Sequence, residues 1–352
     1  IGAGGQLLGH DGRGDQREFD GETAASWIRK NCGIPAATGF GLVTHFYQSR
    51  KKQVPESAVS MGTISDYFAM KLTGRKKPLV HASNAASIGF YDTKQRCFCE
   101  DKIRLAEMDP AILPDTANEM EAVGSYQGIP VTVALGDNQA SFLGAAGKEE
   151  NTLLVNMGTG GQISILSDQY FAEKGIEARP FLNGKYLLVG SSLCGGKSYA
   201  LLEQFFRRVV KAVTGEDSSL YPVMEQFAKT GKEQSNRISE DRKLKIRTTF
   251  DGTRTDPKSS GSIRGLTSDN FTPEAFTYGI LEGMGDELYQ MYRTIKNGTG
   301  IQIKNLIGSG NGVRKNPVFC EMLEELFQNK LVLSAYKEEA AAGAAISSTL
   351  CS

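Results

Sequence analysis

The sequence predicts an α/β protein with two domains. Its 352 residues are more than one ordinary hydrophobic core organises. From Pro130 onward, short apolar runs typical of strands alternate with longer runs whose apolar residues recur at helical spacing. Many of the 40 glycines directly follow apolar runs, where turns near ligands are common. We place the domain boundary near residue 147, between residues 1–147 and residues 148–352.

The expected elements begin with a helix over residues 58–72 that ends at a glycine. Residues 131–135 are then expected as a strand, and residues 139–147 as a short helix. Residues 152–156 and 162–166 read as two strands joined by the tight turn "MGTGG".

The second half continues with a strand over residues 185–190 and a helix over 198–213 with an apolar stripe. Residues 216–265 are polar and irregular, which indicates an insertion or a large loop. The strongest helix follows, because Thr272 can cap it and Pro273 suits its first turn. Its expected buried side consists of Phe276, Ile280, Met284, Leu288, Met291 and Ile295.

The C-terminal part predicts a strand over residues 301–307 and a helix that starts at Asn316 and Pro317. A strand over residues 331–334 and an alanine-rich helix complete the chain. Strands and helices therefore intermix to the end of the sequence.

The composition argues against several classes of protein. Forty Lys and Arg residues balance 40 Asp and Glu residues, so the chain lacks the basic surface of a nucleic-acid-binding protein. With only three His and six scattered Cys, no metal-ligand cluster is expected. No signal segment is evident, and no apolar run approaches the roughly 20 residues that span a bilayer. We expect a cytoplasmic protein with no nucleic-acid or membrane partner.

Asp137 stands between Gly136 and Asn138 at the end of an apolar run. A carboxylate at the C-terminal end of a strand, beside the start of a helix, lies where α/β proteins usually bind ligands. There it could take the proton of a hydroxyl that attacks a phosphoryl group. For that role we expect it to be buried and to face the glycine turn across an interdomain gap. The alternative is that Asp137 only caps its own helix.

The turn at Gly158, Thr159 and Gly160 lets the backbone approach a ligand closely. Its N–H groups and the Thr159 hydroxyl suit phosphate oxygens. The alternative is a glycine-rich hairpin with no ligand.

Two other glycine-rich segments lie between a strand and a helix. "IGSGNG" favours a nucleotide at a helix N-terminus, but it is not a dinucleotide fingerprint, because the third glycine position is Val313. "GSSLCGGKS" misses the Walker A pattern, since the glycine expected at residue 191 is Ser191. We therefore favour a close-packed strand-to-helix turn for the second segment.

Four segments carry a resemblance to a known family: "GDNQASFLG", "NMGTGGQ", "GTRTDP" followed by "GSIRGL", and "IGSGNGVRKNP" followed by "EEAAAGAA". Their order and spacing resemble the FGGY carbohydrate kinases. "ATGFGLVTHFY", "GTISDYFAMKLTG" and "SNAASIGFYDT" are similar to the branch of the family that acts on sedoheptulose. Together these segments cover most of residues 36–352.

The resemblance implies two actin-like, ribonuclease-H-like ATPase domains around a central cleft. The first domain would bind the sugar, and the second would bind ATP with Mg²⁺. Asp137 matches the family's catalytic base. The other matching positions are Gln6, Asp11 and Asn138 for the sugar, Gly158, Thr159 and Gly160 for the ATP phosphates, and Gly308, Gly310, Asn311 and Asn316 for the adenosine.

The start of the chain departs from the family pattern. The first strand and its Asp-Gly-Thr-type phosphate loop are absent from this sequence. Leu7 and Leu8 stand where Met-His is usual, and His10 precedes Asp11 where Trp-Gln is usual.

The expected function is ATP-dependent phosphorylation of the terminal hydroxyl of a ketose, first of all sedoheptulose. Its partner would be a small-molecule sugar, and a homodimer is compatible with the sequence. Two alternatives remain open: a kinase for another ketose or polyol such as ribulose or xylulose, and a non-catalytic relative that binds a sugar or nucleotide.

Overall fold

The computed structural model describes residues 12–19 and 21–351, and the chain packs as two compact units. The first unit comprises Ile1–Gly144, Arg179–Tyr186 and Glu338–Ser352, and the second comprises Ala145–Ala178 and Leu187–Lys337. The first unit thus includes two segments that follow residue 147 in the sequence. That the two parts divide sugar binding from ATP binding stays a prediction.

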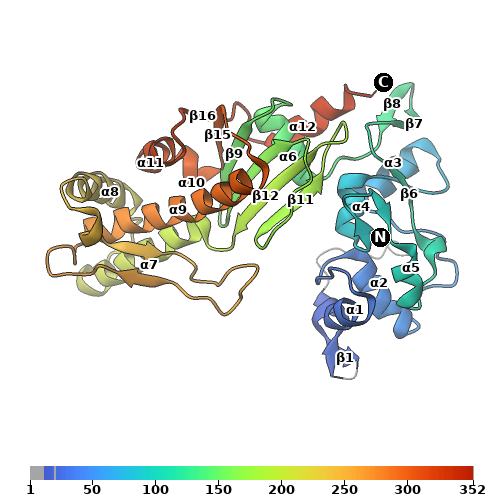
Figure 1. The fold of residues 1–352 in the computed structure, drawn as a ribbon, viewed down its shortest axis with the longest axis horizontal. Coiled ribbons are helices and arrows are strands. Elements are labelled where there is room, and N and C mark those ends of the chain that lie inside the picture. Colours follow the sequence, from blue (N-terminus) through green and yellow to red (C-terminus); the bar gives the residue numbers. More distant parts are fainter. Residues whose placement is uncertain (1–11, 20, 352) are drawn as a thin grey trace. The chain divides into compact units, whose positions relative to one another are not determined.

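The first unit consists of short helices and two-stranded sheets (Figure 1). Its helices are α1 (Ala24–Cys32), α2 (Gly41–Arg50), α3 (Ile64–Thr73), α4 (Ala82–Ile88), α5 (Glu100–Leu105), α6 (Asp137–Ala146) and α12 (Glu339–Ser348), with 3-10 turns η1 (Gly12–Asp15) and η2 (Pro110–Ile112). Its strands are β1 (Arg17–Phe19), β2 (Glu22–Thr23), β3 (Leu79–His81), β4 (Tyr91–Asp92), β5 (Cys97–Phe98), β6 (Asp115–Ala117), β7 (Ala122–Tyr126) and β8 (Ile129–Thr132).

The core of the first unit lies between α1, α2 and α5. Ile28, Leu42, Phe46 and Ile103 are fully buried there. The ring of Trp27, the single tryptophan of the sequence, stacks on Phe46 with the ring centroids 4.9 Å apart. Burial of aromatic and aliphatic side chains is the main stabilising term for such a core.

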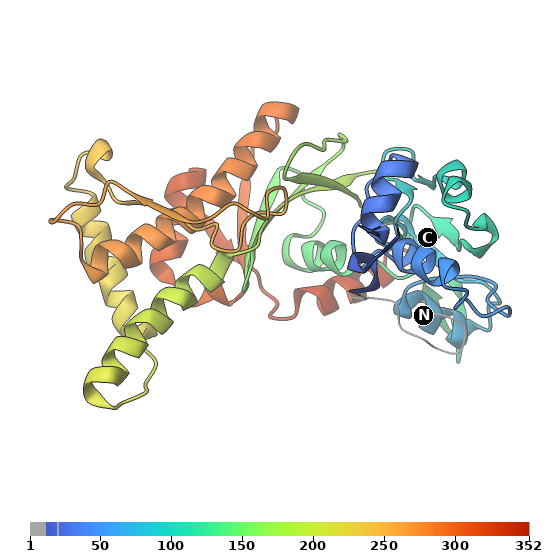
Figure 2. The ribbon, with the colours of Figure 1, turned by 90° about the horizontal axis from the view of Figure 1, so that it is seen from below.

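Helices α6 and α12 lie side by side (Figure 2) and cross at two glycines. A Cβ on Gly343 would lie 1.7 Å from the carbonyl oxygen of Ala140, and one on Gly144 would lie 2.0 Å from that of Glu339. Only glycine allows this approach. The crossing fixes α6, the helix that Asp137 begins.

The second unit is built on a six-stranded sheet with strand order β11-β12-β10-β9-β15-β16. These strands are β9 (Thr152–Met157), β10 (Gly161–Ser167), β11 (Ile176–Pro180), β12 (Tyr186–Ser192), β15 (Asn305–Ser309) and β16 (Leu331–Leu333). β9 and β10 form an antiparallel hairpin, whereas β15 runs parallel to both β9 and β16.

Most helices of the second unit pack beside this sheet, and α8 packs on α9 instead (Figure 1). The helices of this unit are α7 (Gly195–Thr214), α8 (Tyr221–Ser235), α9 (Pro273–Thr299), α10 (Asn311–Arg314) and α11 (Pro317–Phe327). The 3-10 turn η3 (Glu240–Arg242) and the hairpin of β13 (Lys245–Arg247) and β14 (Ser262–Arg264) complete the unit. Within the described residues, no helix is both long and apolar enough to cross a bilayer.

The predicted helix starts are confirmed where capping signals are strong. Thr272 caps α9 by accepting a hydrogen bond from the Ala275 N–H at 3.2 Å. Asn316 caps α11 by accepting one from the Phe319 N–H at 3.0 Å. A polar side chain before a proline is a local signal, which needs no tertiary contact to act.

The helix expected over residues 58–72 begins only at Ile64, and the strand expected over residues 301–307 begins only at Asn305. Two further expectations about elements were wrong. Residues 216–265 hold the 15-residue helix α8 and the β13–β14 hairpin rather than only irregular chain. α8 packs closely on α9, because a Cβ on Gly231 would lie 2.3 Å from the Glu274 carbonyl oxygen. The strand expected over residues 131–135 is β8, which ends at Thr132, so the segment before Asp137 is a loop.

Candidate functional site

Asp137 is the first residue of α6, and its side chain is exposed. The expectation of a buried carboxylate was therefore wrong, because the helix begins at the surface of its unit. Asp137 is also not the cap, since the first helical bond runs from the Ala140 N–H to the Gly136 carbonyl at 2.8 Å. Its Oδ1 accepts from the Asn138 N–H at 2.7 Å.

Asn138, predicted to contact the sugar, is half-buried in the first turn of α6. Its Oδ1 is enclosed and has no hydrogen-bond partner among the described residues. Gln6 and Asp11, the other predicted sugar ligands, lie outside the described residues.

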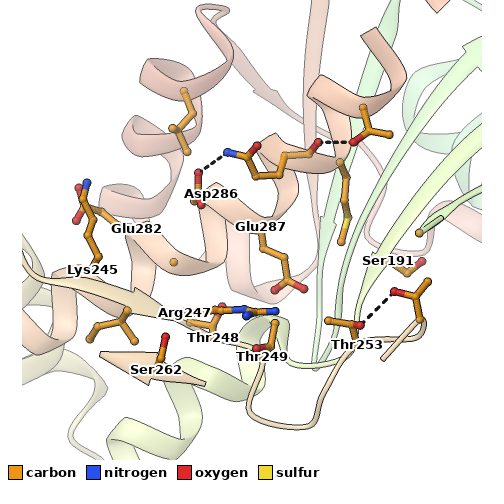
Figure 3. A pocket seen from close by; sticks show the side chains of 18 of the residues that line it. Ser191, Lys245, Arg247, Thr248, Thr249, Thr253, Ser262, Glu282, Asp286 and Glu287 are labelled. Atoms are coloured by element: carbon orange, nitrogen blue, oxygen red, sulfur yellow. Dashed lines mark hydrogen bonds between the residues drawn. The ribbon is translucent and has the colours of Figure 1, made fainter. Parts of the chain in front are cut away.

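A cavity of about 850 Å³ opens beside α9 in the second unit (Figure 3). Arg247, Thr248 and Glu287 are among its lining residues, and none of the predicted ATP-binding residues is. Burial raises the pKa of Glu287, which accepts a hydrogen bond from the Ser192 Oγ at 2.8 Å. This bond ties α9 to the end of β12.

The predicted phosphate turn is the tip of the β9–β10 hairpin. Gly158 and Thr159 are exposed, and the Gly158 N–H donates to the Gly160 carbonyl at 3.0 Å. A Cβ on Gly158 would meet nothing within 4 Å. Gly160 differs, because its Cβ would lie 2.7 Å from the Ser192 carbonyl oxygen. The turn is therefore open on one side and tightly packed on the other.

The predicted adenosine segment lies next to this turn. β15 and β9 are parallel neighbours, with Ser309 opposite Asn156. Gly310 follows β15 with φ +80°, and its Cβ would lie 2.5 Å from the Met157 carbonyl oxygen. Both glycine loops thus leave the carboxyl ends of adjacent parallel strands, which is the usual ligand edge of α/β sheets.

The two predicted asparagines lie near this edge. Asn311 is exposed at the start of α10. Asn316 uses its side-chain oxygen to cap α11, so its amide NH₂ group is the part left for a ligand.

A third segment of this edge is the start of α7, which the sequence analysis predicted as a close-packed turn but not as part of the site. The Gly196 N–H donates to the Gly158 carbonyl at 3.1 Å, and the Lys197 N–H donates to the Thr159 carbonyl at 3.0 Å. A Cβ on Gly195 would lie 2.4 Å from the Gly161 nitrogen. "GSSLCGGKS" is indeed a close-packed strand-to-helix turn, and its glycines were the available signal.

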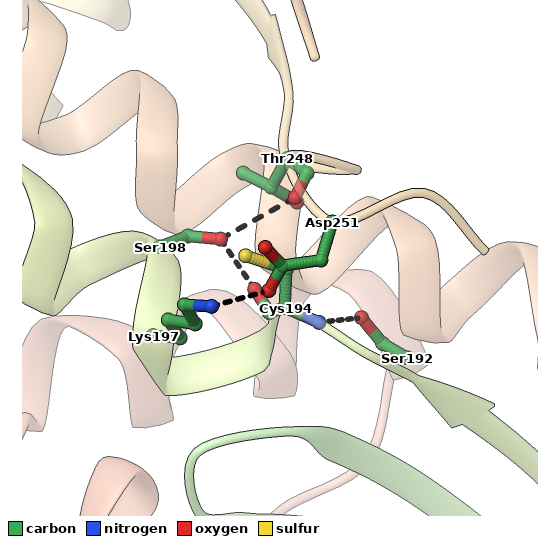
Figure 4. Close-up of polar contacts among 6 residues, drawn as sticks. All are labelled: Ser192, Cys194, Lys197, Ser198, Thr248 and Asp251. Carbon is green, nitrogen blue, oxygen red and sulfur yellow. Dashed lines mark hydrogen bonds and ion pairs between the residues drawn. The ribbon is translucent and has the colours of Figure 1, made fainter. Parts of the chain in front are cut away.

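Lys197 carries a positive charge beside the turn (Figure 4). Its Nζ lies 2.7 Å from the Asp251 Oδ2, and both side chains are about two-fifths exposed. The hydrogen bond between them lowers the pKa of Asp251 and raises that of Lys197. Ser198 holds this end of the helix by donating to the carbonyls of Cys194 and Thr248.

Residues 153–349 match the family model described as "FGGY family of carbohydrate kinases, C-terminal domain". This is more than half of the chain. The chain belongs to the FGGY family. The match includes the glycine turn, the start of α7 and the segment after β15.

Curated relatives extend the similarity to most of the chain. It is 26% identical to the sedoheptulokinase of Mus musculus over 326 residues, covering 86% of this chain and 65% of the relative. It is also 26% identical to the sedoheptulokinase of Homo sapiens over 347 residues, covering 92% of this chain and 70% of the relative. The chain thus spans about two thirds of the length of these relatives.

Solved structures share the fold. The xylulose kinase from Rhodospirillum rubrum superposes with a TM-score of 0.76 at 19% identity, covering 92% of this chain and 66% of that one. Plasmodium falciparum glycerol kinase with ADP gives a TM-score of 0.72 at 19% identity, covering 92% of this chain and 65% of that one. This likeness confirms the predicted α/β class with two actin-like domains. Among the described residues, no group of three or more His, Cys, Asp or Glu is arranged to hold a metal ion.

Proposed function

We propose that this FGGY-family chain belongs to an ATP-dependent sugar kinase that phosphorylates the terminal hydroxyl of a ketose, sedoheptulose in the first place. The observation that carries the proposal is the convergence of three glycine loops at the carboxyl edge of β9 and β15. They are the turn at Gly158, the segment at Gly310 and the start of α7 at Gly196. The 26% identity to two sedoheptulokinases supports the choice of sugar.

The residues present fit a nucleotide phosphate chain. Gly158 has open space where a side chain would stand, so a phosphate can approach the peptide N–H groups of the turn. Lys197 adds a flexible cation whose backbone is held on the same turn. Mg²⁺, carried by the ATP phosphates, would share their negative charge.

Asp137 would act on the sugar. A hydroxyl is a weak nucleophile while it keeps its proton, and an exposed carboxylate on a fixed helix end can accept that proton as the oxygen attacks. Asn138, next in the chain, would orient the sugar through its side-chain amide. Phosphoryl transfer needs positioning and charge stabilisation more than covalent help, so few reactive side chains are required.

The test is an ADP-release assay on the whole polypeptide in which this sequence occurs. We expect sedoheptulose-dependent turnover, and a drop of roughly 10²–10⁴-fold in kcat for Asp137→Asn. Asp115→Asn is a control, because Asp115 is an exposed carboxylate of the first unit outside the proposed site. Full activity of Asp137→Asn, or no turnover with any sugar, would refute the proposal.

A second candidate is a kinase for another ketose, favoured by the fold shared with several xylulose kinases. Comparing kcat/KM for sedoheptulose, xylulose and ribulose separates the two candidates. ATP and sugar binding measured by calorimetry without turnover would instead identify a non-catalytic relative.

A further inference from the structure

The loop that precedes Asp137 is held by two side chains of α4. The Gly136 N–H donates to the Ser83 Oγ at 2.9 Å, and the Asn84 Nδ2 donates to the Ala134 carbonyl at 3.0 Å. Ser83 is buried, with 7% of its surface exposed. Ser83 and Asn84 each lie 50 or more positions before the loop residue that they bind, so they fix the loop by tertiary contact.

The hydrogen bonds of Ser83 have a definite direction. The Ser83 N–H donates to the His81 Nδ1 at 3.1 Å, so this ring nitrogen is an acceptor without a proton. The Ser83 Oγ lies 2.8 Å from the same Nδ1, so its hydroxyl must donate to it. The lone pairs of Ser83 are thereby left for the Gly136 N–H. A neutral His81 with its proton on Nε2 is the form that supports this chain.

Burial keeps the imidazole neutral, and its Nε2 is enclosed with no hydrogen-bond partner among the described residues. His81 is fully buried, and this burial lowers its pKa to about 4. Protonated Nδ1 would point a hydrogen at Ser83 and leave the Ser83 N–H without its acceptor. At neutral pH the chain of bonds from His81 through Ser83 to Gly136 is therefore intact.

The other side of Asp137 is fixed as well. The Gln139 Nε2 donates to the Pro180 carbonyl at 3.0 Å, and Gln139 is 3% exposed. A Cβ on Gly136 would lie 2.7 Å from the Gln139 Oε1, so this side chain also packs closely against the loop. Asp137 is thus an exposed carboxylate whose backbone is held on both sides by buried polar side chains.

We infer that His81 and Ser83 are positioning residues for Asp137: their hydrogen-bonded pair anchors the Gly136 amide and so sets where the Asp137 carboxylate stands. This inference rests on the proposed role of Asp137 as the base. The Ser83 hydroxyl touches no reacting atom in this scheme, so its loss should affect kcat rather than ATP binding. A misplacement of about 1 Å can cost on the order of 10²-fold in rate.

The variants are Ser83→Ala, Ser83→Thr and Ser87→Ala. Thr keeps the hydroxyl, and Ser87 is the matched control because it lies on the same helix, is exposed, and donates only locally to the Asn84 carbonyl at 2.7 Å. We expect Ser83→Ala to lower kcat by about 10- to 100-fold with the KM for ATP within about twofold. Ser83→Thr should recover most of kcat, and Ser87→Ala should match the wild type.

Amide hydrogen exchange gives a readout that does not depend on activity. The Gly136 amide should exchange faster in Ser83→Ala and keep its protection in Ser83→Thr and Ser87→Ala. Fluorescence of Trp27, which lies in the same unit, checks that each variant is folded.

Wild-type kcat in Ser83→Ala, or unchanged exchange at Gly136, would overturn the positioning role alone. A low kcat in Ser83→Thr with its Gly136 amide still protected would do the same. A wild type without sugar-dependent turnover would instead overturn the proposed function, and the positioning role with it.

Discussion

Gly158→Ala offers a sharp test of the phosphate turn, because the structure predicts opposite effects on stability and activity. A Cβ at this position would meet nothing within 4 Å, and Gly158 is not among the residues with positive φ. The substitution should therefore leave the folded state unstrained. By restricting the unfolded chain it should stabilise the protein by about 0.4–1 kcal/mol.

Activity should move the other way if the open space is where a phosphate binds. The new methyl group would stand beside the peptide N–H groups of the turn and displace the phosphate from at least one of them. A hydrogen bond to a charged group contributes about 1.5–3 kcal/mol. At 1.4 kcal/mol per factor of ten, the KM for ATP should rise by about 10- to 150-fold.

The assay pairs steady-state kinetics in ATP with urea unfolding followed by circular dichroism. Gly12→Ala is the control, because a Cβ on Gly12 also meets nothing within 4 Å and lies in the other unit. Gly160→Ala is the contrast, because its Cβ would lie 2.7 Å from the Ser192 carbonyl oxygen and should destabilise the fold. An unchanged KM for ATP in Gly158→Ala would refute the phosphate role of the turn.

Three further perturbations follow from the geometry. Gly343→Ala should destabilise the first unit by about 1–3 kcal/mol or more and lower kcat, because its Cβ would lie 1.7 Å from the Ala140 carbonyl oxygen. Trp27 fluorescence during urea unfolding measures the loss of stability, and wild-type stability would contradict the close crossing of α6 and α12. Since the folded pKa of His81, about 4, lies below its ordinary 6.5, its contribution to stability is present above pH 6.5 and lost as pH falls toward 4. Between pH 7 and pH 5 the wild type should thus lose about 2 kcal/mol more than His81→Asn in the same fluorescence assay, and equal losses would count against a buried neutral imidazole. Lys197→Ala should raise the KM for ATP by about 10- to 150-fold, which is the effect of one charge-assisted hydrogen bond. Stability should change little because the ion pair with Asp251 is about two-fifths exposed, and an unaltered KM would assign Lys197 to a surface ion pair only.

The elements that the sequence predicted well are those with local signals. Thr272 before Pro273, and Asn316 before Pro317, give capped helix starts that depend on a few neighbouring residues. Helix α8 was missed because it buries few large apolar residues. Its buried residues are Met224, Ala228 and Gly231, of which Gly231 packs closely on α9, and small residues that pack closely leave little trace in a hydrophobic pattern.

What the sequence could not show about the candidate site depends on contacts between distant segments. The register of β15 with β9 places Gly310 beside the phosphate turn, and a sequence pattern does not show which strands are neighbours. Likewise Gly196 and Ser83 look like ordinary residues of a glycine-rich turn and a short helix. Their relation to Gly158 and Gly136 appears only when the chain is folded.

The two halves of the proposed chemistry share one physical arrangement. In the second unit, glycines packed against backbone at Gly160, Gly196 and Gly310 hold a turn whose tip is open. In the first unit, buried polar side chains hold the loop before Asp137, whose carboxylate is exposed. Because Asp137 and the turn tip at Gly158 are exposed, substitutions there should alter rates without unfolding the protein. Substitutions at the packed positions should do both, since a rigid backbone is what keeps an exposed group in place.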